Sequence, residues 1–262
     1  MSVLIINGSP RADGTVARIL HIIEAETKKR GCKTAFIDAA SLSFASCTGC
    51  MACRSKGACV LPHDDAHDIA EQVRQCDAVA VGTPVYWGGM SGDLKRLLDR
   101  LVYVLMDESP LGIPVPLHKG KRAVIAAACT TPFPFNIICG QTSGAFGSLR
   151  EILSSSGFAV KRRIAVPGTK GADKLTFRRE RQAKKCAEAL AAKAGNSRRF
   201  CREAGVRRFG FFLRQGNAVG IGAPAAGSPG TKWRDEPRLA AKCGKPDPKG
   251  AAAGCDRREP PG

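Results

Sequence analysis

The chain opens on the stretch Val3-Leu4-Ile5-Ile6-Asn7-Gly8-Ser9-Pro10-Arg11-Ala12-Asp13-Gly14-Thr15. Its uncharged apolar run predicts a buried β-strand that ends at Asn7-Gly8, and a polar loop follows. Apolar residues then recur with the spacing of one helix face over 16–23. A strand, a tight loop and a helix start in this order direct backbone N–H groups at an anion. The stretch predicts either a phosphate-binding loop or an ordinary strand–turn–helix connection, because Gly, Ser and Pro are also common turn residues.

Three side chains of this loop have the chemistry that phosphate oxygens require. Ser9 and Thr15 offer hydroxyl groups, and Arg11 offers a rigid fork of positively charged N–H donors. These residue types favour the phosphate-binding interpretation without deciding it.

Length and composition indicate one main domain in a soluble protein. The chain has 262 residues, a formal net charge of +18 and 12 cysteines. No apolar run reaches the roughly 18 residues of a membrane span and no signal peptide precedes the first strand, so we expect a soluble, cytoplasmic protein. Cysteines in that compartment favour metal, redox or buried thiols over disulfides. The positive charge suits a phosphate-bearing cofactor, with nucleic-acid binding as a minor alternative.

Apolar runs alternate with helical patterns along the first 194 residues. Further strands are predicted at 33–38, 77–82, 122–129 and 158–166, and further helices at 67–76, 91–101, 145–154 and 173–193. Strands that are apolar along their length are typical of a parallel sheet covered by helices on both faces. We therefore predict an α/β domain over 1–194 with a doubly wound, five-stranded parallel sheet. Residues 195–262 contain 12 Gly and 7 Pro without a periodic pattern, which predicts a disordered, basic tail.

Ligands of such sheets bind at the carboxyl ends of the strands, where the strand order reverses. Three loops reach this edge, at 8–14, 83–90 and 130–141. Tyr86 and Trp87 offer flat rings beside glycines, suited to flank a planar ring system, although both could instead be core aromatics. The candidate cofactor-binding residues are Ser9, Arg11, Gly14, Thr15, Thr83, Pro84, Val85, Tyr86, Trp87, Gly88 and Thr130.

Four cysteines lie close together in a long loop at 39–63, with the spacing C-x2-C-x2-C-x5-C. They are Cys47, Cys50, Cys53 and Cys59. Three thiolates at intervals of three can wrap one face of a [4Fe–4S] cluster and a fourth can close it. Zinc and unligated redox thiols are the alternatives, since structural zinc sites usually pair two separated C-x2-C knuckles.

Taken together, three motifs resemble a known family. They are Gly8-Ser9-Pro10-Arg11 with Gly14, the four-cysteine loop, and Gly82-Thr83-Pro84-Val85-Tyr86-Trp87-Gly88-Gly89. In this order the chain resembles the flavodoxin-like NAD(P)H-dependent FMN reductases, and within them the iron–sulfur flavoprotein branch. The resemblance covers about residues 1–194 and implies the flavodoxin-like strand order 2-1-3-4-5. It also implies noncovalent FMN, with Ser9 and Arg11 on the phosphate and residues 84–87 against the flavin ring.

The resemblance implies an FMN-dependent NAD(P)H oxidoreductase that passes electrons to a quinone, a flavin or another acceptor, without a catalytic side chain. Homodimers are common among such reductases. An alternative is an iron–sulfur flavoprotein that carries electrons between proteins. One position departs from the family pattern, because Val16 stands where similar members often carry a hydroxyl, and Thr15 could substitute for it. No sequence fingerprint separates NADH from NADPH.

The order 2-1-3-4-5 places the second strand next to the first. The cysteine loop leaves the carboxyl end of that second strand, so we expect the cysteines at the same edge as the flavin loops. His63 and His67 follow the cysteines at helical spacing. Asp64 and Asp65 between them favour a solvated helix start over a metal site, and acids suit that position electrostatically.

Overall fold

A computed structural model describes residues 1–171 and 175–192 of the chain. Its main sheet is parallel, with five strands in the order β2-β1-β3-β6-β7. The strands are β1 (Ser2–Asn7), β2 (Lys33–Asp38), β3 (Ala78–Pro84), β6 (Arg122–Ala128) and β7 (Ala159–Val166). Counted along the main sheet only, this is the order 2-1-3-4-5, so the predicted flavodoxin-like fold is confirmed.

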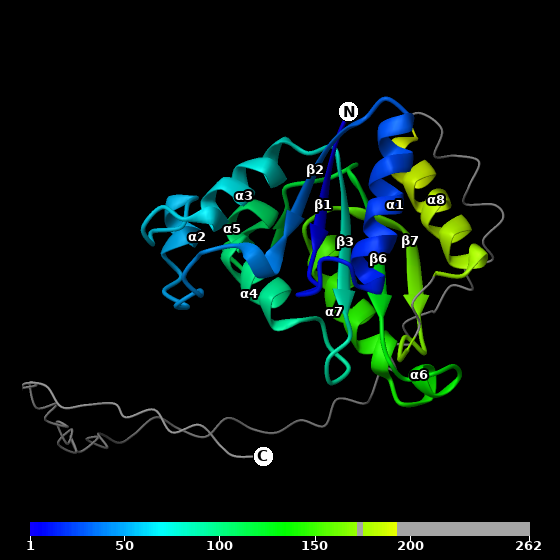
Figure 1. Ribbon diagram of the computed structural model, residues 1–262. Helices are drawn as coiled ribbons and strands as arrows, with labels where there is room; N and C mark the ends of the chain where they lie inside the picture. The colour runs from blue at the N-terminus through cyan, green and yellow to red at the C-terminus, as the bar shows by residue number, and fades with distance from the viewer. Residues whose placement is uncertain (172–174, 193–262) are drawn as a thin grey trace, which may run out of the picture. The chain divides into compact units, whose positions relative to one another are not determined.

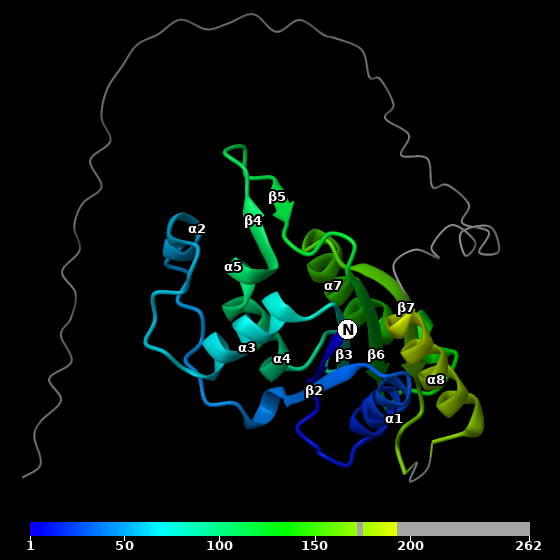
Figure 2. The ribbon, with the colours of Figure 1, turned by 90° about the horizontal axis from the view of Figure 1, so that it is seen from above.

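Helices cover both faces of the sheet (Figures 1 and 2). Helices α1 (Thr15–Lys29) and α8 (Phe177–Ala191) lie on one face. The opposite face is covered by α3 (Asp65–Gln75), α4 (Gly92–Arg100), α5 (Val102–Leu105) and α7 (Gln141–Ser155). This is the layered arrangement expected of strands that are apolar on both sides.

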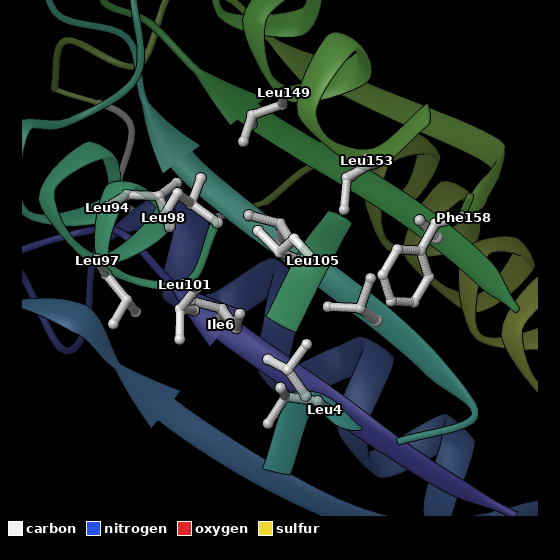
Figure 3. Close-up of a cluster of buried hydrophobic side chains, with 14 of the residues drawn as sticks. Leu4, Ile6, Leu94, Leu97, Leu98, Leu101, Leu105, Leu149, Leu153 and Phe158 are labelled. Atoms are coloured by element: carbon white, nitrogen blue, oxygen red, sulfur yellow. The ribbon is translucent and has the colours of Figure 1, made fainter. Parts of the chain in front are cut away.

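The side chains of β1 pack alternately into two hydrophobic clusters, one on each face of the sheet. Leu4 and Ile6 point into the cluster under α4 and α7 (Figure 3), whereas Val3 and Ile5 belong to the cluster under α1 and α8. All four side chains are buried. Because successive side chains of a strand point to opposite faces, an uncharged run is what such a central strand needs.

Several short elements lie where no element was predicted. A small antiparallel hairpin is formed by β4 (Met106–Glu108) and β5 (Pro114–Pro116), and the long loops contain η1 (Ala39–Ser41), α2 (Ala52–Lys56) and α6 (Phe135–Ile138). The predicted last helix, 173–193, is α8 at Phe177–Ala191. The predicted tail, 195–262, lies outside the described residues. Within the described part of the chain, every helix is too short or too polar to cross a membrane.

Candidate functional site

A cavity of about 340 Å³ opens at the carboxyl edge of the sheet, beside the ends of β1, β3 and β6. Eight of the predicted cofactor-binding residues line it, namely Ser9, Arg11, Gly14, Thr15, Pro84, Val85, Tyr86 and Thr130. The volume lies within the range of about 300–1,000 Å³ of small-molecule sites. The structure therefore brings the three predicted loops together around one hollow.

The loop after β1 is held by its own polar side chains. Asn7 is fully buried, its amide donates to Asp38 at 2.7 Å, and its oxygen accepts the backbone N–H of Ser9 at 3.0 Å. The Ser9 hydroxyl in turn accepts the backbone N–H of Arg11 at 3.2 Å. These hydrogen bonds fix the backbone of the loop.

Helix α1 begins at this loop without a side-chain cap. Its N-cap is Gly14, which offers no side-chain hydrogen bond to the first turn, and no acidic residue lies in that turn. The first N–H groups of a helix have no intrahelical acceptor and lie at the positive end of the helix dipole. With Arg11 and Thr15 in the same cavity wall, the helix start is suited to accept an anionic oxygen group.

Two glycines allow the loops after β1 and β3 to approach closely. The N–H of Gly8 donates to the carbonyl of Gly82 at 2.7 Å, and the Ser91 hydroxyl donates to the carbonyl of Gly8 at 2.6 Å. A Cβ at Gly8 would lie 2.9 Å from the Gly82 oxygen, and one at Gly82 would lie 2.7 Å from Val16. The close packing of β1, β3 and α1 beside the cavity therefore favours glycine at both positions.

The second loop ends in a tight hairpin at its tip. Tyr86 and Gly89 exchange two backbone hydrogen bonds, of 3.1 and 2.9 Å. Trp87 and Gly88 between them have φ of +51° and +76°, the signature of a type I′ turn. The left-handed conformation is unfavourable for a bulky residue such as tryptophan. Backbone strain at Trp87 therefore accompanies full exposure of this residue.

This turn lies on the start of helix α7. A Cβ added to Gly144 would lie 2.2 Å from the carbonyl oxygen of Gly88. Only glycine lets the helix and the turn come so close. Helix α7 thus sets the position of the Trp87–Gly88 tip.

Three predicted residues do not line the cavity. Thr83 is fully buried; its hydroxyl donates to the carbonyl of Pro84 at 2.8 Å and accepts the N–H of Ser91 at 2.9 Å. Its observed role is to shape the loop. Trp87 and Gly88 stand at the tip beyond the cavity rim. Contact of these three residues with a cofactor stays a prediction.

Seven further residues that were not predicted from the sequence line the cavity. The further lining residues are Asp13, Val16, Arg18, Ala128, Cys129, Thr169 and Gly171. Thr169 reaches the site because its N–H donates to the carbonyl of Cys129 at 3.1 Å, which joins the ends of β6 and β7. The loop after β7 carries no sequence motif, but it too follows the carboxyl end of a strand and could be placed at this edge on that ground.

The cysteine loop begins at the carboxyl edge of the sheet, as predicted, but its thiols do not line the cavity at that edge. Cys53 lines a different cavity, of about 530 Å³, with Arg74 and Lys121. Lys121 directly precedes β6 and Arg74 lies near the end of α3, so this cavity lies at the amino ends of the strands. None of the four cysteines lines the carboxyl-edge cavity. The expectation that the cysteines lie beside the flavin loops is therefore wrong within this chain, because 25 residues are enough to run along the side of the sheet.

The four thiols of the cysteine loop differ in their exposure. Cys47 and Cys50 are exposed, whereas Cys53 and Cys59 are half-buried. Burial raises the pKa of Cys53, and the neighbouring Cys59 and Cys47 raise it further, although Arg54 opposes them. Across 1–171 and 175–192, however, no three His, Cys, Asp or Glu side chains converge closely enough to hold a metal ion. Four thiols are chemically suited to bind an iron–sulfur cluster, but in this structure they do not lie close enough together to bind one.

A buried ion pair closes the ends of the cysteine loop. The Arg100 guanidinium, whose side chain is 1 % exposed, binds both carboxylate oxygens of Asp64 at 2.8 and 2.9 Å and donates to the carbonyl of Ala45 at 2.5 Å. Burial raises the pKa of Asp64, but hydrogen bonds from Arg100, Ala45 and His67 outweigh it and leave the pKa below its usual value. The predicted helix start is confirmed, because Asp64 is the N-cap of α3 and forms a capping box with His67. Its carboxylate is not solvated as expected, since it is 16 % exposed and paired with Arg100.

The chain was compared with known proteins. The sequence model of the family described as NADPH-dependent FMN reductase matches residues 1–133. An iron–sulfur flavoprotein of Methanocaldococcus jannaschii is 35 % identical over 100 residues, which are 38 % of this chain and 51 % of that protein. One from Archaeoglobus fulgidus is 38 % identical over 100 residues, or 38 % of this chain and 48 % of that protein. The chain thus spans about half the length of these curated relatives.

Solved structures show the same fold. An FMN-dependent NADH-azoreductase of Bacillus anthracis, in complex with FMN, superimposes with a TM-score of 0.56 at 15 % identity. The match covers 72 % of this chain and 97 % of that one. At this identity the likeness concerns the arrangement of strands and helices alone.

Proposed function

Because the chain belongs to the NADPH-dependent FMN reductase family, we propose that it is an oxidoreductase that binds FMN at the carboxyl-edge cavity. It takes electrons from NADH or NADPH and passes them to a small acceptor such as a quinone or a free flavin. The observation that carries this proposal is the uncapped start of α1 in a cavity that Arg11 and Thr15 line. The iron–sulfur flavoproteins among its relatives support the same branch.

The residues present fit FMN. The start of α1 with Arg11 would hold the phosphate, and Pro84, Val85 and Tyr86 would lie along the ring. Bound FMN supplies the hydride chemistry between nicotinamide and acceptor. The side chains bind and orient it, and none needs to act as acid or base. Because Asn7 and Ser9 already hold the loop, the phosphate meets a preformed site.

Titration with FMN and with riboflavin tests the phosphate site directly, since riboflavin lacks the phosphate. We expect FMN to bind more tightly than riboflavin. The Arg11→Gln variant should weaken FMN roughly tenfold to a hundredfold, since it loses a charge-assisted hydrogen bond, and should leave riboflavin unchanged. Arg181→Gln, an exposed position on α8, is the matched control. Equal affinity for the two flavins, or no flavin binding, would refute the proposed site.

A second candidate is an iron–sulfur flavoprotein that carries electrons between proteins. It is favoured by the printed names of the relatives together with the four thiols of the cysteine loop. Because the thiols do not converge, we derive no electron path through a cluster. Iron and acid-labile sulfide in anaerobically purified protein, lost in Cys50→Ser and retained in Cys139→Ser, would support this candidate. Protein that oxidises NADPH rapidly without iron supports the reductase alone.

We also propose that the chain is a cytoplasmic homodimer that associates beside the flavin site. Large apolar side chains stand exposed there, and they are Tyr86, Trp87, Phe133, Phe135, Ile137 and Ile138. Exposed apolar clusters of this kind favour association. Ile138→Asp should shift the sedimentation of the protein to that of a monomer, while Leu111→Asp, on the hairpin, should not. A monomeric parent protein would exclude the dimer.

A further inference from the structure

The turn at the tip of the loop after β3 carries a residue that its backbone disfavours. A type I′ turn has positive φ at both of its central positions, and Asn-Gly is strongly preferred there. In this chain the first central position is Trp87, with φ of +51°, and Gly88 follows it. Tryptophan therefore stands where the conformation of the turn favours asparagine.

Packing within the described part of the chain does not offset this strain. Trp87 is fully exposed, and across 1–171 and 175–192 its ring belongs to neither hydrophobic cluster and stacks on no other ring. A tryptophan gains free energy on folding when it removes its large apolar area from water, and this one remains in water. A residue that breaks a local rule without a gain in stability is typical of a functional position.

The backbone of the loop holds this indole beside the carboxyl-edge cavity. On one side of the turn Tyr86 lines the cavity, and Val85 packs against the hydrophobic cluster under α4 and α7. On the other side Met90 packs against the same cluster. The close approach of Gly88 to Gly144 fixes the tip itself. The indole thus follows directly on the cavity wall, on a support that is anchored on both sides and at its tip.

We propose that Trp87 determines the specificity for the electron acceptor, because its indole stacks on planar acceptors such as a quinone or a second flavin. This inference rests on the proposed flavin function and adds no chemical step to it. With FMN along Pro84, Val85 and Tyr86, an acceptor that enters from solvent meets the indole at the rim. Aromatic rings attract one another in offset or edge-to-face arrangements, whereas a compact ion without a flat ring gains nothing from such a contact. The strained turn is then the cost of presenting a large ring to the acceptor on a fixed backbone.

Two acceptors of different shape test the proposal on the FMN-loaded full chain. Anthraquinone-2-sulfonate is a planar fused-ring acceptor, and ferricyanide is a compact ion. Trp87→Asn suits the left-handed turn, so the fold should be retained. Calorimetric titration of the oxidised protein without NADPH should show that this variant binds anthraquinone-2-sulfonate roughly three- to tenfold more weakly than the parent. In anaerobic kinetics, kcat/KM for anthraquinone-2-sulfonate should fall by the same factor relative to kcat/KM for ferricyanide.

Two further variants serve as controls. Trp87→Phe keeps a ring that can stack and should retain most of the affinity for anthraquinone-2-sulfonate. Phe177→Asn, at an exposed aromatic position on α8, should bind this acceptor like the parent. If Trp87→Phe binds no better than Trp87→Asn, a stacking ring is not what holds the acceptor, and the proposal is overturned.

The remaining outcomes separate failure of this proposal from failure of the proposed function. Equal affinity of parent and Trp87→Asn for anthraquinone-2-sulfonate, with FMN bound in both, refutes the role of Trp87 and leaves the flavin site standing. Weaker FMN binding by Trp87→Asn would place the indole on the cofactor, and dissociation of a parental dimer in sedimentation would place it at the subunit contact. Either result overturns the proposal. A parent protein that binds no flavin refutes the proposed function and this inference together.

Discussion

Two glycines of helix α7 provide a matched pair of substitutions. At Gly147 a new Cβ meets nothing within 4 Å, whereas at Gly144 it would lie 2.2 Å from the carbonyl oxygen of Gly88. Gly147→Ala should stabilise the protein by about 0.8 kcal/mol, since alanine is the better helix former by that amount. Gly144→Ala gains the same propensity but must displace the Trp87–Gly88 turn by about 1 Å, an overpacking that costs about 1–3 kcal/mol.

The two variants should therefore move the melting temperature in opposite directions. Gly147→Ala should raise Tm by about 2–3 °C, and Gly144→Ala should lower it by a similar amount. Gly144→Ala should also weaken FMN, because Tyr86 in the cavity wall is joined to the displaced turn. Differential scanning calorimetry and FMN titration measure the two effects. The reasoning is refuted if both variants stabilise the protein equally and bind FMN like the parent.

Three further substitutions test the loop contacts. Arg100→Met removes the cationic partner of the half-buried Asp64 carboxylate and should lower the free energy of unfolding in urea by about 3 kcal/mol, against less than about 1 kcal/mol for the exposed Lys95→Met. Since the folded pKa of Asp64 lies below its unfolded value of about 3.9, its stabilisation should be present above that pH and be lost as pH falls through the folded pKa. Asp64→Asn should flatten that part of the pH–stability curve; an unchanged curve contradicts the ion pair. Trp87→Asn should raise stability by about 1 kcal/mol in the same urea assay, because asparagine tolerates the left-handed conformation, and a loss would show that the indole packs.

The sheet could be predicted from the sequence because each strand is an apolar run that polar or glycine-containing loops delimit. The strand predicted at 33–38 has the bounds of β2, and the helix predicted at 91–101 begins with Ser91 as its cap, whose hydroxyl accepts the Leu94 N–H at 3.4 Å. The hairpin of β4 and β5 was missed because three-residue strands with prolines carry no usable periodicity. Local sequence patterns thus identify long helices and strands, but they miss short ones whose conformation depends on contacts with other parts of the chain.

The candidate site was predictable to the extent that its residues follow strand ends. Loop positions 8–14 and 83–88 are attached directly to β1 and β3, so the fold alone brings them together. The cysteine loop is held by residues that are distant in the sequence, such as Arg74 of α3, which donates to the carbonyl of Gly57. A sequence records neither that contact nor the pairing of Asp64 with Arg100. The predicted position of the thiols was wrong for this reason.

The pairing of Asp64 with Arg100 also anchors one segment of the chain at both of its ends. The same guanidinium holds Ala45 and Asp64, so both ends of the segment between them are fixed at one point on α4. Closing a loop costs little more as it lengthens, about 0.6 kcal/mol for each doubling. Apart from the contacts of Arg54 with Glu108 and of Gly57 with Arg74, the position of residues 46–63 is thus set at the two ends of the segment. We expect a change in the length of this segment to cost little free energy and to leave the sheet and the carboxyl-edge cavity as they are.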